Sequence, residues 1–276
     1  MPASVAALLQ PHLEARQQEL VWLFAVCFAC WNVLNVVSLK LPIPDQHLPR
    51  HEMLDLRNRL VSTVHGFFAI ILTAYNTFFK AAACGDSNTH FEDLLLVFSL
   101  SYFWYDMLSM AYLGIMDRNM FMHHVFSISG ITFTVYSSTS GHEVIYGFLA
   151  TEVSNPAMHL RQILRYLGLR YSKSYEAAEY SFAVSYLIAR MGGVTHCIAN
   201  LWLCPSTNLV VRLAGIGLLV QSWGFSFQIM SIMRQRMVEY AERKRKNIRM
   251  KWFTALSKEE IAKVDAYQRK EKKAAA

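Results

Sequence analysis

The chain has 276 residues, of which 54% are hydrophobic and 17% charged, and its apolar residues gather in blocks of about 20. Blocks of this length can cross a bilayer as helices, which excludes an ordinary soluble globular protein and predicts an integral membrane protein of the all-α class. The formal net charge of +7 does not indicate a nucleic acid partner, because most of the basic excess lies beside the apolar blocks and in the tail, where membrane topology explains it.

Seven membrane spans are predicted, each about 17 to 25 residues long and bounded by charged residues, Pro or Gly. They cover about residues 20–39, 60–79, 94–114, 121–136, 144–160, 177–202 and 209–233. The expected fold is a polytopic membrane helical bundle of about seven transmembrane helices. We divide the chain into residues 1–56, with the first span and a polar connection, a helical bundle at 57–233, and a basic tail at 234–276.

Charged residues also predict the orientation of the chain. The N-terminal stretch before the first span has two glutamates and one arginine, which matches neither a cleaved signal nor a transit peptide, so we expect a signal anchor. Lys and Arg gather in the connections after the odd-numbered spans, and the opposite side has little beyond Arg16 and Lys80. Because short cytoplasmic loops carry the basic excess, the N-terminus is expected outside and the C-terminus in the cytoplasm.

Two features follow from this orientation. Cys84 and Cys204 lie on the same outer side, and an oxidising lumen there would let them pair, a point that the sequence leaves open. The basic cluster of the tail is expected to contact anionic lipid headgroups, with a solvated charged face as the alternative.

Ionisable side chains occur in the central or inner zone of five predicted spans: His65, Asp106, the His123–His124 pair, Glu152 and Arg190. Such groups are costly inside a membrane and usually face a bundle interior or a wet cavity, so they predict one shared cavity. Helical spacing adds three residues to the same faces, namely Tyr102, Ser127 and Asn155.

Other interpretations of these residues stay open. Asp106, Glu152 and Arg190 could form a purely structural ion pair. Adjacent histidines point about 100° apart, so the pair could make a polar contact at a helix boundary. His65, His123 and His159 all lie toward the inner side and could form a metal site, but the cysteines and histidines lack the spacing of metal ligands, and we expect none.

Five segments, in order, resemble signatures of the TLC domain family, which contains the ceramide synthases and the translocating-chain-associated membrane proteins. The resemblance covers about residues 57–233 and rests on Ser62-Thr63-Val64-His65, Tyr102-Phe103-Trp104-Tyr105-Asp106, Met122-His123-His124-Val125-Phe126-Ser127-Ile128-Ser129-Gly130, Thr151-Glu152-Val153-Ser154-Asn155-Pro156 with Arg161, and Ala189-Arg190.

For a ceramide synthase the resemblance implies acyl transfer from acyl-CoA, with His123 and His124 as the catalytic pair. The fifth span departs from the synthase pattern, because Thr151-Glu152-Val153-Ser154-Asn155-Pro156 stands where His-Asp-x-x-Asp is expected. It is similar instead to the smaller TLC domain-containing proteins, which implies a role in membrane lipid composition or trafficking.

The expected function is therefore to bind a lipid or acyl chain in the bundle and to influence membrane lipid composition. The residues expected to bind the lipid are His65, Tyr102, Asp106, Ser127, Glu152, Asn155 and Arg190. One alternative is an acyl-CoA-dependent acyltransferase that uses His123 and His124, and another is a structural subunit of a larger membrane complex. The resemblance also implies the endoplasmic reticulum or another internal membrane. It requires no cofactor, and acyl-CoA belongs to the acyltransferase alternative alone.

Overall fold

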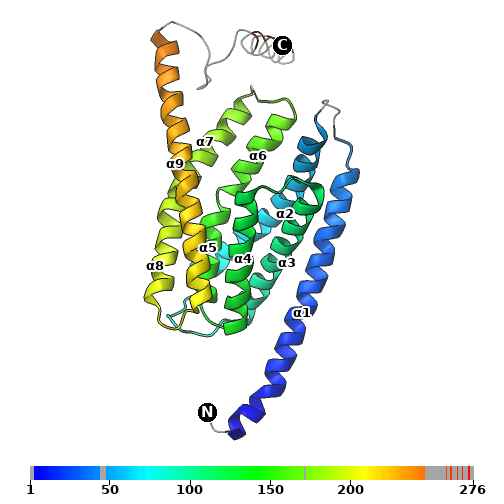
Figure 1. Ribbon diagram of the computed structural model, residues 1–276, viewed down its shortest axis with the longest axis vertical. Coiled ribbons are helices and arrows are strands. Elements are labelled where there is room, and N and C mark those ends of the chain that lie inside the picture. Colours follow the sequence, from blue (N-terminus) through cyan, green and yellow to red (C-terminus); the bar gives the residue numbers. More distant parts are fainter. Residues whose placement is uncertain are drawn as a thin grey trace.

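The computed structural model is a helical bundle (Figure 1) that describes residues 3–43, 48–170 and 172–245 and five single positions between 259 and 273. The prediction of an all-α membrane bundle is confirmed. Its elements are α1 (Ala3–Lys40), α2 (Arg50–Phe79), α3 (His90–Leu113), α4 (Arg118–Ser137), α5 (Gly141–Glu152), α6 (Asn155–Tyr166), α7 (Lys173–Leu187), the π-helix η1 (Ile188–Val194), α8 (Thr195–Leu203) and α9 (Leu209–Arg245).

Five helices of the described chain are long and apolar enough to cross a membrane: Ala15–Lys40, Arg50–Phe79, His90–Leu113, Lys173–Leu203 and Leu209–Val238. They correspond to the predicted first, second, third, sixth and seventh spans. Lys173–Leu203 is one continuous helical stretch made of α7, η1 and α8.

The predicted fourth and fifth spans differ from these five. The fourth is α4, a helix of 20 residues that packs against α3 and α9. The fifth is divided at Val153 and Ser154 into α5 and α6. Pro156 explains the division, because proline has no N–H for a continuous helix and favours the first turn of a new one. A break such as the one between α5 and α6 is tolerated at membrane depth where neighbouring helices surround it.

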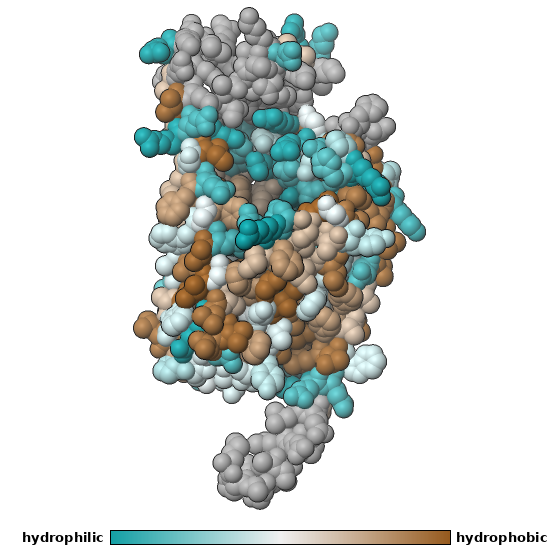
Figure 2. Space-filling model, viewed as in Figure 1, coloured by the Kyte–Doolittle hydropathy of each residue, from teal (hydrophilic) through white to brown (hydrophobic). Residues whose placement is uncertain are grey.

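The outer surface of the bundle is apolar over its middle. Figure 2 shows this zone on one face, with polar residues gathered toward the two ends. Large side chains such as Trp22, Phe78 and Tyr112 are mostly exposed, as expected for residues that face lipid. The interior is built from two clusters of buried residues: one surrounds α3, and the other joins α5, η1, α8 and α9.

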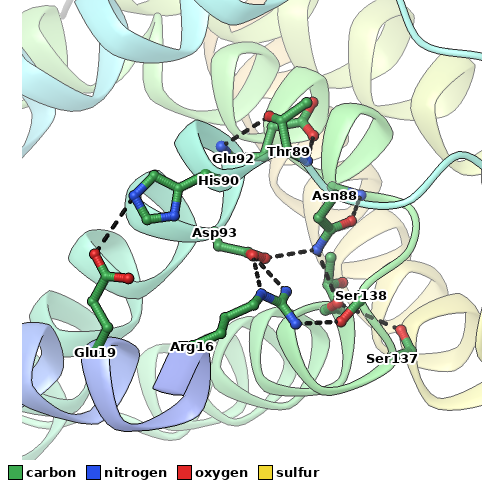
Figure 3. A network of polar contacts seen from close by, with 11 residues as sticks. Arg16, Glu19, Asn88, Thr89, His90, Glu92, Asp93, Ser137 and Ser138 are labelled. Atoms are coloured by element: carbon green, nitrogen blue, oxygen red, sulfur yellow. Dashed lines mark hydrogen bonds and ion pairs between the residues drawn. The ribbon is translucent and has the colours of Figure 1, made fainter. Parts of the chain in front are cut away.

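A buried carboxylate fastens α1 to the rest of the bundle (Figure 3). Asp93 of α3, only 1% exposed, pairs with Arg16 of α1 and accepts a hydrogen bond of 3.1 Å from the Asn88 amide. Arg16 also donates to the Ser138 hydroxyl at 2.8 Å. A second buried contact, from the Trp31 indole N–H to the Ser101 hydroxyl at 3.1 Å, fixes the same two helices further along. These bonds place α1 lengthwise along α3.

At the end of the bundle where α9 begins, a disulfide joins Cys84 to Cys204. It connects the α2–α3 segment to the α8–α9 segment, which answers the question that the sequence left open. The predicted lipid-binding cluster of the tail lies mostly outside the described residues. The proposed divisions after residues 56 and 233 fall inside α2 and α9, and they stay a prediction.

Candidate functional site

A cavity of about 600 Å³ lies inside the bundle, with walls from α2, α3, α4, α5, α6, α7, η1 and α9. It brings together every predicted site residue except Ser127: His65, Tyr102, Asp106, His123, His124, Glu152, Asn155 and Arg190. Their roles stay a prediction, but their meeting in one space makes a common ligand chemically feasible.

Exposure of the lining residues shows which end of the cavity approaches the surface. The side chains of Arg59, Arg161, Glu179 and Arg236 are 25%, 27%, 22% and 23% exposed. Asp106, His124, Glu152 and Arg190 are buried. The cavity therefore has a deep polar zone and a charged end, which we call the inner mouth and define by Arg59, Arg161, Glu179 and Arg236.

His124 is held by two partners. Asp117 caps α4 through the Met120 N–H, and the Met120 carbonyl then lies 2.7 Å from Nδ1 of His124. Nε2 of His124 lies 3.0 Å from Oδ2 of Asp106, whose other oxygen accepts a bond of 2.7 Å from the Asn58 amide. Because a carbonyl oxygen can only accept, Nδ1 carries a hydrogen, and the remaining nitrogen is engaged with the carboxylate. His124 has no free nitrogen to receive an acyl group.

His123 has a different environment. Its ring packs edge-on against Phe103, with 5.9 Å between ring centroids, and it makes no ion pair among the described residues. The side chain lines the large cavity and also borders a second, apolar cavity of about 70 Å³. The adjacent histidines therefore have different environments. His124 connects α4 to α3 through Asp106, and His123 lines the two cavities.

Arg190 comes from η1, the π-helical segment within the sixth span. Its guanidinium donates to the Thr151 carbonyl at 3.0 Å and the Ser222 hydroxyl at 3.4 Å, and it lies over the Tyr186 ring at 5.1 Å. Its Nε has no partner, and no described carboxylate lies within ion-pair distance. π-Helical segments occur often at functional sites, because they turn side chains away from the regular helical positions.

The structural ion pair considered for Asp106, Glu152 and Arg190 is absent from the described residues. Asp106 is paired with His124. Glu152 accepts a hydrogen bond of 3.0 Å from the Asn155 amide at the break between α5 and α6. Arg190 is thus a buried cation whose close protein partners are uncharged.

Two further predicted residues pack together at the side of the cavity. His65 stacks on Tyr102 with 3.8 Å between ring centroids, and its Nε2 lies 3.5 Å from the Ser99 hydroxyl. Both rings contact Trp31 edge-on. They form a wall whose shape is fixed by aromatic packing.

Ser127 lies outside the large cavity. It lines the smaller one together with Gly130, Gly147, Cys197 and Ala214, because it is one helical turn beyond His123 on α4. A Cβ at Gly147 would lie 2.9 Å from the Cys197 sulfur, so the absence of a side chain lets α5 and α8 approach closely. The small space is lined almost entirely by apolar groups.

His159 also lines the cavity, on the helical face that the sequence predicted for Asn155. It is 7% exposed, and its Nδ1 has no partner. The sequence analysis did not identify other lining residues. Arg161 was treated as a loop charge, and Glu179 and Arg236 were not considered. Among the described residues, no group of three His, Cys, Asp or Glu side chains is arranged to hold a metal ion.

Comparison with protein-family models places the chain in a family. The family model of the TLC domain matches residues 55–233, which run from the first turns of α2 to the middle of α9. No solved structure matches the chain. The match includes the deep zone of the cavity and leaves α1 and Arg236 outside.

Proposed function

The chain belongs to the TLC domain family, and from this we propose that it binds one acyl lipid in its cavity and influences membrane lipid composition. It is an integral, multi-pass membrane protein. The ligand's carbonyl or carboxylate oxygen lies against Arg190, beside His123, and its acyl chain lies along the apolar walls.

Arg190 is the observation that carries this proposal. An arginine stays protonated in proteins, and a buried charge is costly unless hydrogen bonds and an opposite charge compensate it. Neutral groups contact this guanidinium, its Nε is unsatisfied, and it faces a space of about 600 Å³. An oxygen-bearing ligand would supply the missing acceptor. Phe182, Phe225 and Ile229 offer apolar surface in the same cavity for a chain.

The acyltransferase alternative depends on His123. His124 is occupied by Asp106 and Met120, which weighs against its use as an acyl carrier. His123 makes no ion pair among the described residues and could take an acyl group from acyl-CoA. The third alternative, a structural subunit of a membrane complex, needs no ligand at all.

Purification in a mild detergent followed by native mass spectrometry and lipid extraction tests the proposal. The wild-type protein should retain about one acyl lipid per chain, and Arg190→Gln should retain at least about tenfold less. Arg212→Gln is the matched control, because Arg212 also has an unsatisfied Nε but lines neither cavity. Equal lipid retention in the wild type and Arg190→Gln would refute the site.

The same preparation separates the alternatives. An acyl adduct on the intact protein that disappears in His123→Ala would establish the acyltransferase. A lipid-free protein that purifies with one stoichiometric membrane partner would favour the structural subunit. Arg190→Gln and His123→Ala should keep the thermal unfolding midpoint of the wild type within a few degrees if their effects are local.

We also propose that the inner mouth faces the cytoplasm and that the Cys84–Cys204 end faces an oxidising lumen. The basic connections lie at the first end, and disulfides persist in oxidising compartments. Family analogy favours the endoplasmic reticulum or another internal membrane.

A further inference from the structure

We propose that the inner mouth is an entry site for an anionic acyl lipid: Arg161 and Arg236 capture its acidic headgroup, and Glu179 closes the entry between α7 and α9 when no headgroup is there. The inference rests on the proposed lipid-binding function. It adds the charge of the ligand, the path by which it enters, and a binding step distinct from that at Arg190.

Three helices meet at one carboxylate. Arg236 of α9 binds Glu179 of α7 at 2.5 Å, and Arg161 of α6 lies 3.4 Å from the other oxygen of the same carboxylate. The Arg161 guanidinium also lies over the Phe182 ring, 5.6 Å from its centroid, which holds it at the wall of the cavity. A carboxylate held by two guanidiniums marks a place where an external carboxylate or phosphate would fit.

The two arginines have unused donors. Nε of Arg161 and Nε of Arg236 are both buried and without a hydrogen-bond partner. Each guanidinium has five N–H donors in a planar fork, and one shared carboxylate cannot satisfy two forks. An incoming acidic headgroup would supply further acceptor oxygens in the geometry that arginine binds best.

Other charged groups at this end are already engaged. Asp55 accepts a bond of 2.7 Å from Arg59 and one of 2.6 Å from the Tyr166 hydroxyl. Asp117 caps α4 through the Met120 N–H. Among the described residues, Glu179 is the carboxylate that pairs with both arginines, so its departure toward solvent would leave Arg161 and Arg236 attractive to an anion.

The position of the ion pairs suits an entry. α7 and α9 share few other contacts, and α9 continues past Arg236 away from the bundle (Figure 1). Phe182 and Ala183 from α7 and Ile229 and Ile232 from α9 line the cavity on either side of this seam. Partly exposed ion pairs are weak and are screened by salt, so Glu179 can exchange with a headgroup. An acyl chain could then slide in between the apolar walls.

The mouth and the Arg190 site are separate steps. Ser222, which contacts Arg190, and Arg236 are fourteen positions apart on α9, which corresponds to about 21 Å along the helix. Changes at the mouth should therefore alter the rate of lipid entry and leave the final affinity at Arg190 largely intact.

Stopped-flow quenching of tryptophan fluorescence by 9,10-dibromostearate, compared with its methyl ester, tests the entry step on the full chain in nanodiscs. The acid should enter the wild-type protein at least about tenfold faster than the ester. Arg161→Gln and Arg236→Gln should slow the acid by about tenfold and leave the ester unchanged. Glu179→Gln should speed the acid, because the competing carboxylate is gone.

Arg165→Gln and Arg234→Gln are matched controls on α6 and α9. Both arginines are exposed and lie outside the lining of the cavity, so both variants should behave as the wild type. If an arginine variant unfolds, Arg161→Lys, which keeps the charge but loses the planar fork, and Glu179→Gln still decide the question.

The inference is overturned if the acid and the ester enter the wild type at the same rate, if the arginine variants slow both probes equally, or if Glu179→Gln fails to speed the acid. Failure of the proposed function looks different: neither probe would quench saturably in the wild-type protein.

Discussion

At the residue scale, the two adjacent histidines illustrate how identical side chains acquire different roles. His124 turns into the bundle and forms a buried pair with Asp106, while His123 faces the cavities. Neighbours on a helix point about 100° apart, so only one of them could reach α3. Both nitrogens of His124 are engaged, whereas His123, with Gln221 as its polar neighbour, faces the space where a ligand can be contacted.

This difference predicts the result of a double-mutant cycle. Asp106→Ala should lower the free energy of unfolding by about 3–5 kcal/mol, because it leaves His124 and Asn58 without their buried acceptor. His124→Ala in the Asp106→Ala background should cost much less than in the wild type. Thermal unfolding in detergent measures both. Additive losses would show that the two side chains do not stabilise one another.

At the element scale, the π-helix η1 decides where Arg190 lies. Its packing against α5 is unusually close at Gly193, where a Cβ would lie 2.8 Å from the Cβ of Ala150. Gly192 beside it has no atom within 4 Å of such a Cβ. The absence of a side chain at Gly193 therefore permits the close approach of η1 and α5. At Gly192 a side chain would have room, so glycine is not required there.

Gly193→Ala should lower the free energy of unfolding by about 1–3 kcal/mol and weaken lipid retention, because η1 and Arg190 would be pushed from α5. Ala150→Gly in the same chain should restore both properties. Gly192→Ala should be neutral or stabilise by up to about 1 kcal/mol, since alanine favours helix and has room there. Thermal unfolding with lipid analysis measures the series, and equal effects of the two alanine substitutions would contradict the packing argument.

At the scale of the whole molecule, charge and the disulfide mark opposite ends. Arg59, Arg161 and Arg236 lie at the inner mouth, while the Cys84–Cys204 bond lies where α9 begins. Arg16, one of the few basic residues predicted on the outer side, is neutralised there by Asp93. The arrangement supports the orientation proposed from the basic loops.

Thiol labelling in sealed microsomes with the cytoplasmic face outward tests this orientation. A variant with Cys27, Cys30 and Cys197 replaced by Ser retains the disulfide pair. A membrane-impermeant reductant and maleimide should label it only after the membrane is permeabilised. In the same background, Lys173→Cys, at an exposed position of the opposite end, should be labelled without permeabilisation. Labelling of Cys84 or Cys204 in sealed vesicles would reverse the topology.

Much of the site could be predicted because the bilayer makes polar residues conspicuous. Asp106, Glu152 and Arg190 each stand alone in an apolar stretch, so a shared interior was the natural expectation. Arg161 and Glu179 occur instead among the other charges near span ends. Their joint contact with Arg236 depends on three helices from distant parts of the chain. No spacing within one helix reveals it.

The sequence by itself determined the membrane class, the helical fold, the approximate spans and eight of the residues that line the cavity. Hydrophobic length and the cost of buried charge act locally, and a single chain shows them. Only the tertiary structure decided that His124 is paired with Asp106 while His123 lines two cavities, that no carboxylate of the described residues pairs with Arg190, and that Glu179 contacts both Arg161 and Arg236. Those facts depend on which groups of different helices lie within a few ångströms of one another, and helix packing alone sets those distances.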